Sequence, residues 1–194
     1  MNLVARAKGM LLSPKSEWDA IDTEPTTVGS LYTDFIIPLA AIPAICGFIG
    51  MSIFGFGLLG TTVRVPIGTG ITNAIVQYVM ALVAVYVLAL IIDALAPNFG
   101  GQKNQMQALK VSAYSSTASW VAGILLLLPG LRTLFILGGL YSLYLLFLGL
   151  PKLMKSPEDK AATYTIVVIV CAVVLFLVVG AVTSRMTGYG GMMG

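Results

Sequence analysis

The chain has 194 residues, of which 58% are hydrophobic and only 10% are charged, and its mean hydropathy is +0.95. Charged residues make up about 25% of an ordinary soluble domain, so this composition excludes a soluble protein and indicates an integral membrane protein. The formal net charge of +3 is small and dispersed along the chain, so nucleic acid is not an expected partner.

The residue types that carry most enzyme and metal chemistry are scarce. The chain contains no histidine, and its two cysteines, Cys46 and Cys171, lie far apart in apolar runs. Neither cysteine has a neighbouring base or a second metal ligand. The sequence therefore predicts no catalytic residue, no metal site, no cofactor and no enzymatic activity.

Residues 1–30 are predicted to form a cytoplasmic amphipathic arm. A helical spacing of Leu3, Ala7 and Leu11 with Arg6 and Lys8 gives a short helix one apolar and one basic face. Ser16 and Asp19 offer the start of a further turn that presents Trp18 and Ile21 to the membrane interface. Arg6, Lys8 and Trp18 are thus the expected interfacial anchors, with the bilayer and its anionic lipid as partners; a merely solvated arm is the alternative.

Five apolar stretches approach or exceed the ~20 residues that a helix needs to cross a bilayer. They are residues 35–59, 71–95, 108–128, 131–150 and 163–182. Pro38 and Pro43 predict a kinked or broken first helix, because proline removes a backbone donor. The sequence therefore predicts an all-α membrane bundle of five transmembrane helices over residues 31–183 and a flexible, glycine- and methionine-rich tail over residues 184–194.

Small residues repeat at three- and four-residue spacing in two of these stretches. Ala40, Ala44 and Gly47 form such a step in the first, and Gly138 with Ser142 forms another in the fourth. Small side chains allow helices to approach closely, so these faces are expected to pack against neighbouring helices. Self-association into a homo-oligomer through the same faces is left open.

Lysine and arginine are unequally divided between the two sides of the predicted bundle. With the N-terminus inside, eight fall on the cytoplasmic side and three outside. The cytoplasmic set is Arg6, Lys8, Lys15, Lys103, Lys110, Lys152, Lys155 and Lys160, and the outer set is Arg64, Arg132 and Arg185. Basic residues favour the cytoplasmic side, so we expect a cytoplasmic N-terminus and an external C-terminus in an inner membrane.

The main polar anomaly joins the second and third stretches. Asp93 stands near the end of one and Lys110 near the start of the next, at matching depth on two antiparallel helices. The sequence predicts an ion pair between them. That pair would fasten a helix hairpin, or it would mark a site that handles protons or cations, since an acid inside a span is a functional candidate by default.

A polar stripe continues along the third stretch. Lys110, Tyr114 and Thr117 fall on one helical face, and Tyr86 on the second stretch shares a face with Asp93. Hydroxyls in membrane helices commonly bond their own backbone or a neighbouring helix. The stripe therefore predicts either helix-to-helix hydrogen bonding or the wall of a hydrated pocket.

Several segments together resemble the bacterial branch of the Yip1 family. They are LLSPKSEWDAI, LYTDFIIPLAAIP, DALAPNFGG, QALKVSAYSSTASWVAGI and GLYSLYLLFLGLPKLM, which cover most of the chain. The resemblance implies a five-span membrane protein with a cytoplasmic N-terminus. Eukaryotic relatives are associated with Rab-type GTPases through a cytoplasmic region before the spans, but residues 1–30 here provide no sizeable binding domain.

Two functional hypotheses remain. In the first, the chain is a non-enzymatic scaffold or adaptor that organises the membrane and recruits an unidentified membrane or cytoplasmic protein. In the second, it is a channel or transporter, with a polar path for an ion or small solute between the second and third spans.

Overall fold

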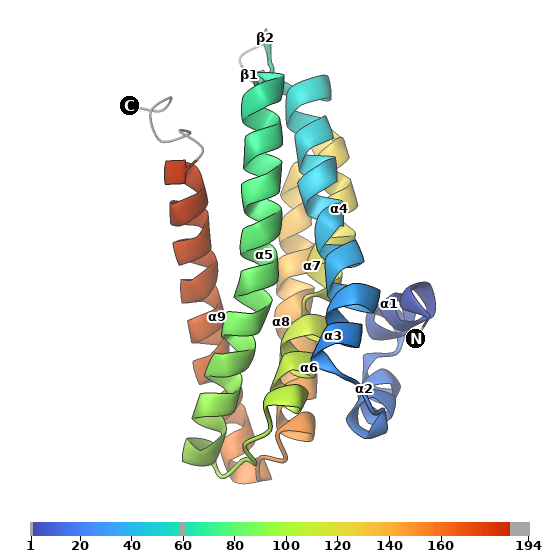
Figure 1. Ribbon diagram of the computed structural model, residues 1–194, viewed down its shortest axis with the longest axis vertical. Coiled ribbons are helices and arrows are strands. Elements are labelled where there is room, and N and C mark those ends of the chain that lie inside the picture. Colours follow the sequence, from blue (N-terminus) through green and yellow to red (C-terminus); the bar gives the residue numbers. More distant parts are fainter. Residues whose placement is uncertain (1, 59–60, 187–194) are drawn as a thin grey trace.

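The computed structural model describes residues 2–58 and 61–186, which form an elongated helical bundle with a helical arm at its side (Figure 1). In that part of the chain, four helical segments are long and apolar enough to cross a membrane: Val28–Phe54, Ile67–Phe99, Gly130–Leu153 and Glu158–Arg185. They correspond to the first, second, fourth and fifth predicted spans. The all-α architecture is confirmed, apart from a small antiparallel pairing of β1 (Phe56–Leu58) with β2 (Thr61–Val63).

The first long segment is irregular, as its prolines predict. It consists of α3 (Val28–Leu31), η1 (Tyr32–Ile36), α4 (Ile37–Phe48) and η2 (Ile49–Phe54), and both η1 and η2 are wide π turns. Pro38 is the second residue of α4, and Pro43 lies further along the same helix. Because proline lacks a backbone N–H, Pro38 and Pro43 each remove one backbone hydrogen bond from the helix, and the π turn η1 ends just before Pro38.

The second and fifth predicted spans are single long helices, α5 (Ile67–Leu95) and α9 (Glu158–Met186). The fourth is α8 (Phe135–Leu153), preceded by the 3-10 turns of η5 (Pro129–Leu134). At the lower end in Figure 1, α5 passes through η3 (Ala96–Phe99) to Gly100. Gly100 has φ +72°, a left-handed conformation that glycine adopts without strain, and it ends the helix there.

The third predicted span, 108–128, is not one continuous helix. It is divided into α6 (Gln105–Ser115), α7 (Thr117–Ala122) and η4 (Gly123–Leu127). At the first break, the hydroxyls of Ser115 and Ser116 both donate to the carbonyl of Ser112. Such side-chain bonds compete with the backbone ladder and bend helices, which explains the interruption.

The arm consists of α1 (Leu3–Leu12) and α2 (Pro14–Thr23), and it packs on the bundle (Figure 1). Trp18 and Ile21 are 1% and 0% exposed, so the prediction that they face the membrane interface is wrong. The reason is a slot on α8, because a Cβ added at Gly149 would lie 2.4 Å from the Trp18 ring. A residue with a side chain at position 149 would displace the indole.

The core under the arm is aromatic. The Tyr114 ring meets Phe35 and Trp18 edge-on, with ring centroids 4.7 and 6.3 Å apart, and Phe35 in turn lies 6.5 Å from Trp120. These rings come from the arm, η1, α6 and α7. Large aromatic surfaces contribute more burial per residue than any other side chain, so this cluster joins the arm to three parts of the bundle.

The two faces of small residues, on the first and fourth predicted spans, pack against other helices of the same chain. Ala40 and Ala44 are buried in α4, which contacts η4, and a Cβ added at Gly138 would lie 2.3 Å from the Cβ of Ala122. Their role in packing is therefore confirmed within one chain. A homo-oligomer built on these faces stays a prediction.

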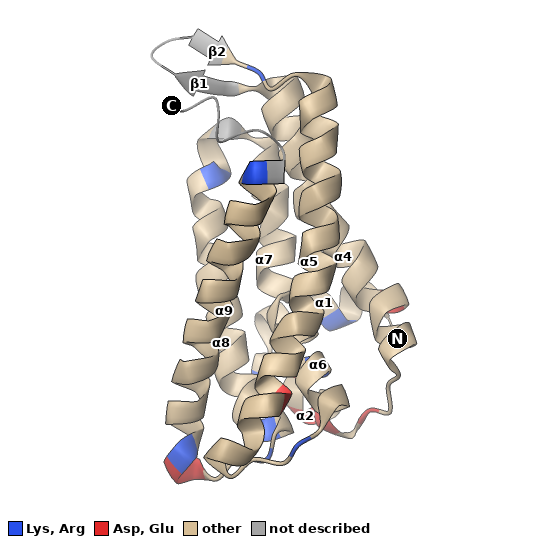
Figure 2. Cartoon of the chain, turned by 60° about the vertical axis from the view of Figure 1, so that its left-hand side comes forward, with Lys and Arg blue, Asp and Glu red and all other residues tan. Residues whose placement is uncertain are grey.

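Charge is distributed unequally between the ends of the bundle (Figure 2). The acidic residues fall in the arm, in the loop to α3, in η1, in the last turn of α5 and in the first turn of α9. The opposite end carries Arg64, Arg132 and Arg185. Helix α9 continues into the predicted tail as far as Met186, and residues 187–194 lie outside the described part.

Candidate functional site

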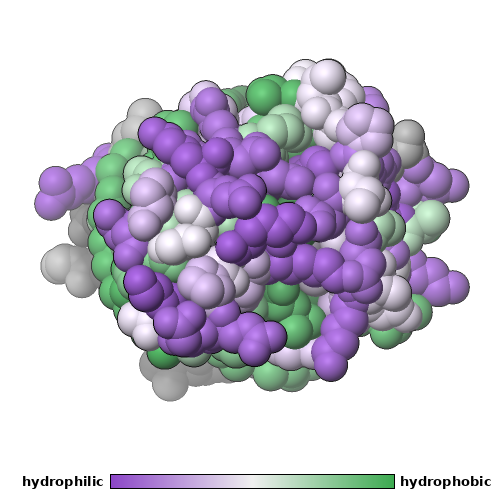
Figure 3. Space-filling view, turned by 90° about the horizontal axis from the view of Figure 1, so that it is seen from below, coloured by the Kyte–Doolittle hydropathy of each residue, from purple (hydrophilic) through white to green (hydrophobic). Residues whose placement is uncertain are grey.

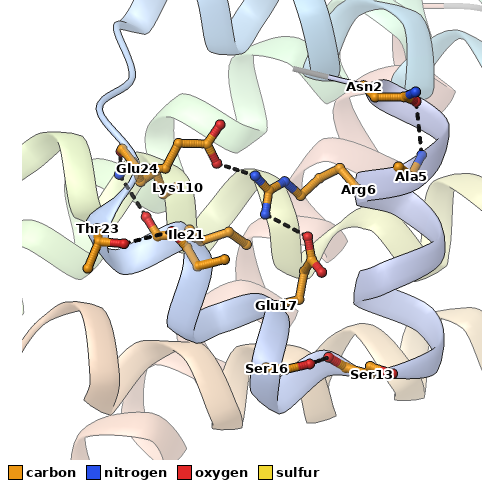
Figure 4. A network of polar contacts seen from close by, with 11 residues as sticks. Asn2, Ala5, Arg6, Ser13, Ser16, Glu17, Ile21, Thr23, Glu24 and Lys110 are labelled. Atoms are coloured by element: carbon orange, nitrogen blue, oxygen red, sulfur yellow. Dashed lines mark hydrogen bonds and ion pairs between the residues drawn. The ribbon is translucent and has the colours of Figure 1, made fainter.

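Lys110 is the buried cation at the centre of the contact between the arm and the bundle. It lies in α6, which begins where the Asn104 side chain accepts a hydrogen bond from the Gln107 backbone N–H at 3.1 Å. Lys110 is 4% exposed, and its Nζ donates to the carbonyls of Ile21 at 2.9 Å and Glu24 at 2.6 Å (Figure 4). These carbonyls close α2, where the helix dipole is negative and backbone acceptors lack partners within the helix. The ammonium therefore caps α2 from across the chain.

A second cation, Arg6, holds α1 to α2 beside Lys110. Its Nη1 donates to Glu17 Oε1 at 2.6 Å, and its Nη2 pairs with Glu24 (Figure 4). The guanidinium also lies 5.7 Å from the centre of the Tyr114 ring, a cation–π distance. Arg6 is thus an internal ion-pair partner rather than the surface anchor that the sequence predicts.

The rim of this contact is formed by two exposed ion pairs between α2 and the end of α8. Asp22 pairs with Lys155, and Asp19 pairs with Lys152. Gln107 Nε2 also donates a hydrogen bond to the backbone carbonyl of Asp22 at 3.1 Å. Exposed ion pairs contribute ~0–1 kcal/mol each, so the buried Lys110 and the aromatic cluster carry most of the attachment.

The predicted ion pair between Asp93 and Lys110 is not formed. Among the described residues no ion pair joins them, because the Lys110 ammonium is bonded to the carbonyls of Ile21 and Glu24 at the end of α2. Asp93 is 7% exposed, and within residues 2–58 and 61–186 its Oδ1 has no hydrogen-bond partner. Next to it, Tyr164 on α9 donates to the Ile92 carbonyl at 2.5 Å and stacks on Phe99 at 5.1 Å.

Asp93→Asn tests whether this carboxylate stabilises the bundle. An unpaired buried charge is costly, whereas a neutral amide of the same shape costs less to bury. We therefore expect the melting temperature of the purified variant to equal or exceed that of the wild type. A lower melting temperature, with the helical circular dichroism signal retained, would mean that a partner compensates the charge.

The remaining polar stripe on α6 and α7 is bonded within the protein. Ser112 Oγ donates to the Val85 carbonyl of α5 at 2.8 Å, and Thr117 Oγ1 donates to the Tyr114 carbonyl at 2.6 Å. Ser119 and Ser142 share a hydroxyl bond of 2.9 Å between α7 and α8. Tyr114 and Thr117 are 1% and 0% exposed. The arrangement is that of helix-to-helix hydrogen bonding and not of a hydrated wall.

The other sequence-predicted residues lie apart from this contact. Tyr86 is 38% exposed, and its hydroxyl accepts from Gln105 Nε2 at 2.9 Å. Lys8 is exposed on α1. The structure therefore joins Arg6, Trp18, Lys110 and Tyr114, and it leaves Asp93, Tyr86 and Lys8 outside.

Sequence reasoning missed Glu17, Glu24 and Tyr164. The two glutamates stand in a polar arm where acids are expected at the surface, so nothing marked them as partners of a buried cation. Tyr164 had one signal: it follows Lys160 at the spacing by which Tyr114 follows Lys110. Both tyrosines are buried, at 0% and 1% exposure.

Comparisons with known proteins agree with the membrane architecture. The model of the Yip1 domain family matches residues 8–181. Two relatives from Escherichia coli strains, K12 and O6:H1, are each named "Inner membrane protein YohC". Each is 27% identical to this chain over 186 residues, a match that covers 94% of this chain and 95% of the relative. No solved structure matches the chain.

Proposed function

This chain belongs to the Yip1 family of integral membrane proteins, and from that premise we propose that it is a non-enzymatic membrane scaffold or adaptor. The scaffold would hold a membrane or cytoplasmic protein at the end of the bundle where the arm docks. The observation that carries the proposal is the inward bonding of the polar residues. Lys110, Arg6 and the α6–α7 hydroxyls bond to other parts of the same chain, which supports a role for these residues in assembly.

We place the protein in an inner membrane, with the arm on the cytoplasmic side and the C-terminus outside. The name of the Escherichia coli relatives supports the membrane. The excess of lysine and arginine at the arm end supports the orientation. In this arrangement α6, α7 and η4 together make the third of five crossings. A bilayer requires partners for the backbone groups that a broken helix leaves free, and side chains supply some of them: Thr117 Oγ1 donates to the Tyr114 carbonyl, and the Ser119 N–H donates to Ser142 Oγ.

The cytoplasmic end is the part that a protein partner would meet. Seen from that end, the surface is largely hydrophilic (Figure 3). It is built from α2, the loop that contains Lys103, and the turn between α8 and α9 that contains Lys155. Contacts of α2 with α8, and a hydrogen bond from the Gln102 N–H to the Met154 carbonyl, bring these segments together on one face, which we call the docking face.

Site-directed crosslinking tests the scaffold. A photoreactive residue placed at Lys103, exposed on the docking face, should give the same heterologous product in repeated membrane preparations, and mass spectrometry should identify its partner. The matched control is the same residue at Leu137, which is 59% exposed on α8 away from that face. Recovery of only self-products from Lys103 would contradict the scaffold.

A second candidate function, passage of an ion or small solute, is favoured by one observation. Asp93 is buried, its Oδ1 has no hydrogen-bond partner in the part of the chain that the structure describes, and an acid inside a span is a functional candidate. Liposomes containing the purified protein should then show an ion flux that Asp93→Asn abolishes. Vesicles that stay tight with the wild-type protein would exclude this function and leave the scaffold.

A further inference from the structure

The arm does not close completely on the bundle. Between α1 on one side and α4 and α7 on the other lies a groove of about 450 Å³, which we call the α1 groove. Leu3, Ala7 and Leu11 line it from α1, and Leu39, Ile42 and Val121 line it from the bundle. The groove is open along one side, and apart from Lys8 its walls are apolar.

Lys8 is the charged residue of this lining. Arg6, two residues earlier in α1, is paired with Glu17 and Glu24, but no ion pair among the described residues includes Lys8. The ammonium is exposed at the groove edge on a flexible apolar stem. Such a stem can follow an apolar surface while its charge reaches the polar layer of a membrane. The α1 groove thus combines an apolar lining with one positive charge, that of Lys8.

The position of the groove along α4 sets its depth in the bilayer. From Leu39 to Phe54 the segment rises by roughly 22 Å at 1.5 Å per residue, and the hydrocarbon layer is ~30 Å thick. If Phe54 lies near the outer boundary, Leu39 lies within the acyl region on the inner side. Val4 and Leu12 also line the groove from α1 and are 73% and 70% exposed, so its apolar wall continues to the outer surface of the arm.

A peptide fits this groove poorly. At this depth each backbone N–H and C=O of a bound segment would need a partner, and the lining supplies apolar side chains. An acyl chain has no hydrogen-bonding groups to satisfy. The phosphate of an anionic lipid has no cation in its own headgroup, so it is available to pair with the Lys8 ammonium. We propose that the α1 groove binds one acyl chain of an anionic phospholipid whose phosphate pairs with Lys8. The proposal rests on the membrane orientation given above but not on the scaffold activity.

Lipid retention tests the proposal. The protein is reconstituted in nanodiscs of phosphatidylcholine with a minor fraction of phosphatidylglycerol and then released for native mass spectrometry. We expect the wild type to retain phosphatidylglycerol in preference to phosphatidylcholine. Lys8→Gln should lower that preference about five-fold, as expected for one basic residue near the membrane surface. The matched control is Lys15→Gln, an exposed lysine that does not line the groove, and it should keep the wild-type preference.

Ala7→Leu gives a second, independent reading, because a larger side chain fills the groove without changing the charge. It should lower retention of both lipids, while Lys8→Gln changes only the selectivity. Equal retention of the two lipids by the wild type, or wild-type selectivity in Lys8→Gln, would overturn the proposal. Crosslinking from Lys103 is read separately, so loss of lipid selectivity and loss of the protein partner are distinguishable.

Discussion

Lys110→Met should lower the free energy of unfolding by about 1.5–3 kcal/mol, the range measured for hydrogen bonds to charged groups. Methionine preserves the length and apolar stem of the side chain. It leaves the carbonyls of Ile21 and Glu24 buried without their donor. Unfolding in mixed micelles by titration with sodium dodecyl sulfate, followed by circular dichroism, measures the change.

The matched control is Lys152→Met, which removes an ion pair with Asp19. The side chains of Lys152 and Asp19 are 34% and 65% exposed. Exposed pairs contribute little, so this control should change the unfolding free energy by less than about 1 kcal/mol. Equal effects of Lys110→Met and Lys152→Met would show that the buried contact does not hold the arm.

Trp18→Ala should be the most damaging substitution in the arm. The indole is 1% exposed, fills the slot at Gly149 and meets the Tyr114 ring. Truncation of a buried tryptophan costs about 3–5 kcal/mol through lost contacts and a cavity. The same titration measures this loss, with Leu12→Ala, on an outer position that is 70% exposed, as the control.

The outcome separates two roles for Trp18. If it anchors the arm in lipid, as the sequence predicts, Trp18→Ala will weaken membrane association of the arm but leave the stability of the bundle unchanged. If it packs as the structure describes, the bundle itself will unfold more easily. A stability equal to that of the wild type would contradict the second role.

The long helices could be predicted from sequence because their signals are local. Length and hydropathy identify α5 and α9 from consecutive residues alone, and proline positions predict the interrupted helix around α4. The break between α6 and α7 was harder to predict. A run of serines is visible in the sequence, but whether their hydroxyls bond a neighbouring helix or their own backbone depends on packing.

The site could be predicted only in part, because its local signals are visible in the sequence but its long-range partners depend on packing. Lys110 stood out as a cation within an apolar region, but its acceptors are backbone carbonyls 86 and 89 residues away, and a carbonyl has no sequence signature. Asp93 is predicted as its partner because the two residues lie at matching depth on neighbouring antiparallel helices, but Lys110 bonds to the end of α2 instead. Trp18 was assigned to the interface because tryptophan is common there, and the slot that receives it comes from Gly149 on a distant helix.

The central claim is that the arm docks on the bundle through α2 and thereby forms the docking face. Cysteines at Asp22 and Lys155, whose side chains pair across this contact, test it most directly in native membranes when Cys46 and Cys171 are replaced by alanine. A short bifunctional maleimide should join Asp22→Cys to Lys155→Cys in high yield and should not join Asp22→Cys to Arg132→Cys at the opposite end. Failure of the first pair to react, or equal yields from both pairs, would contradict a docked arm.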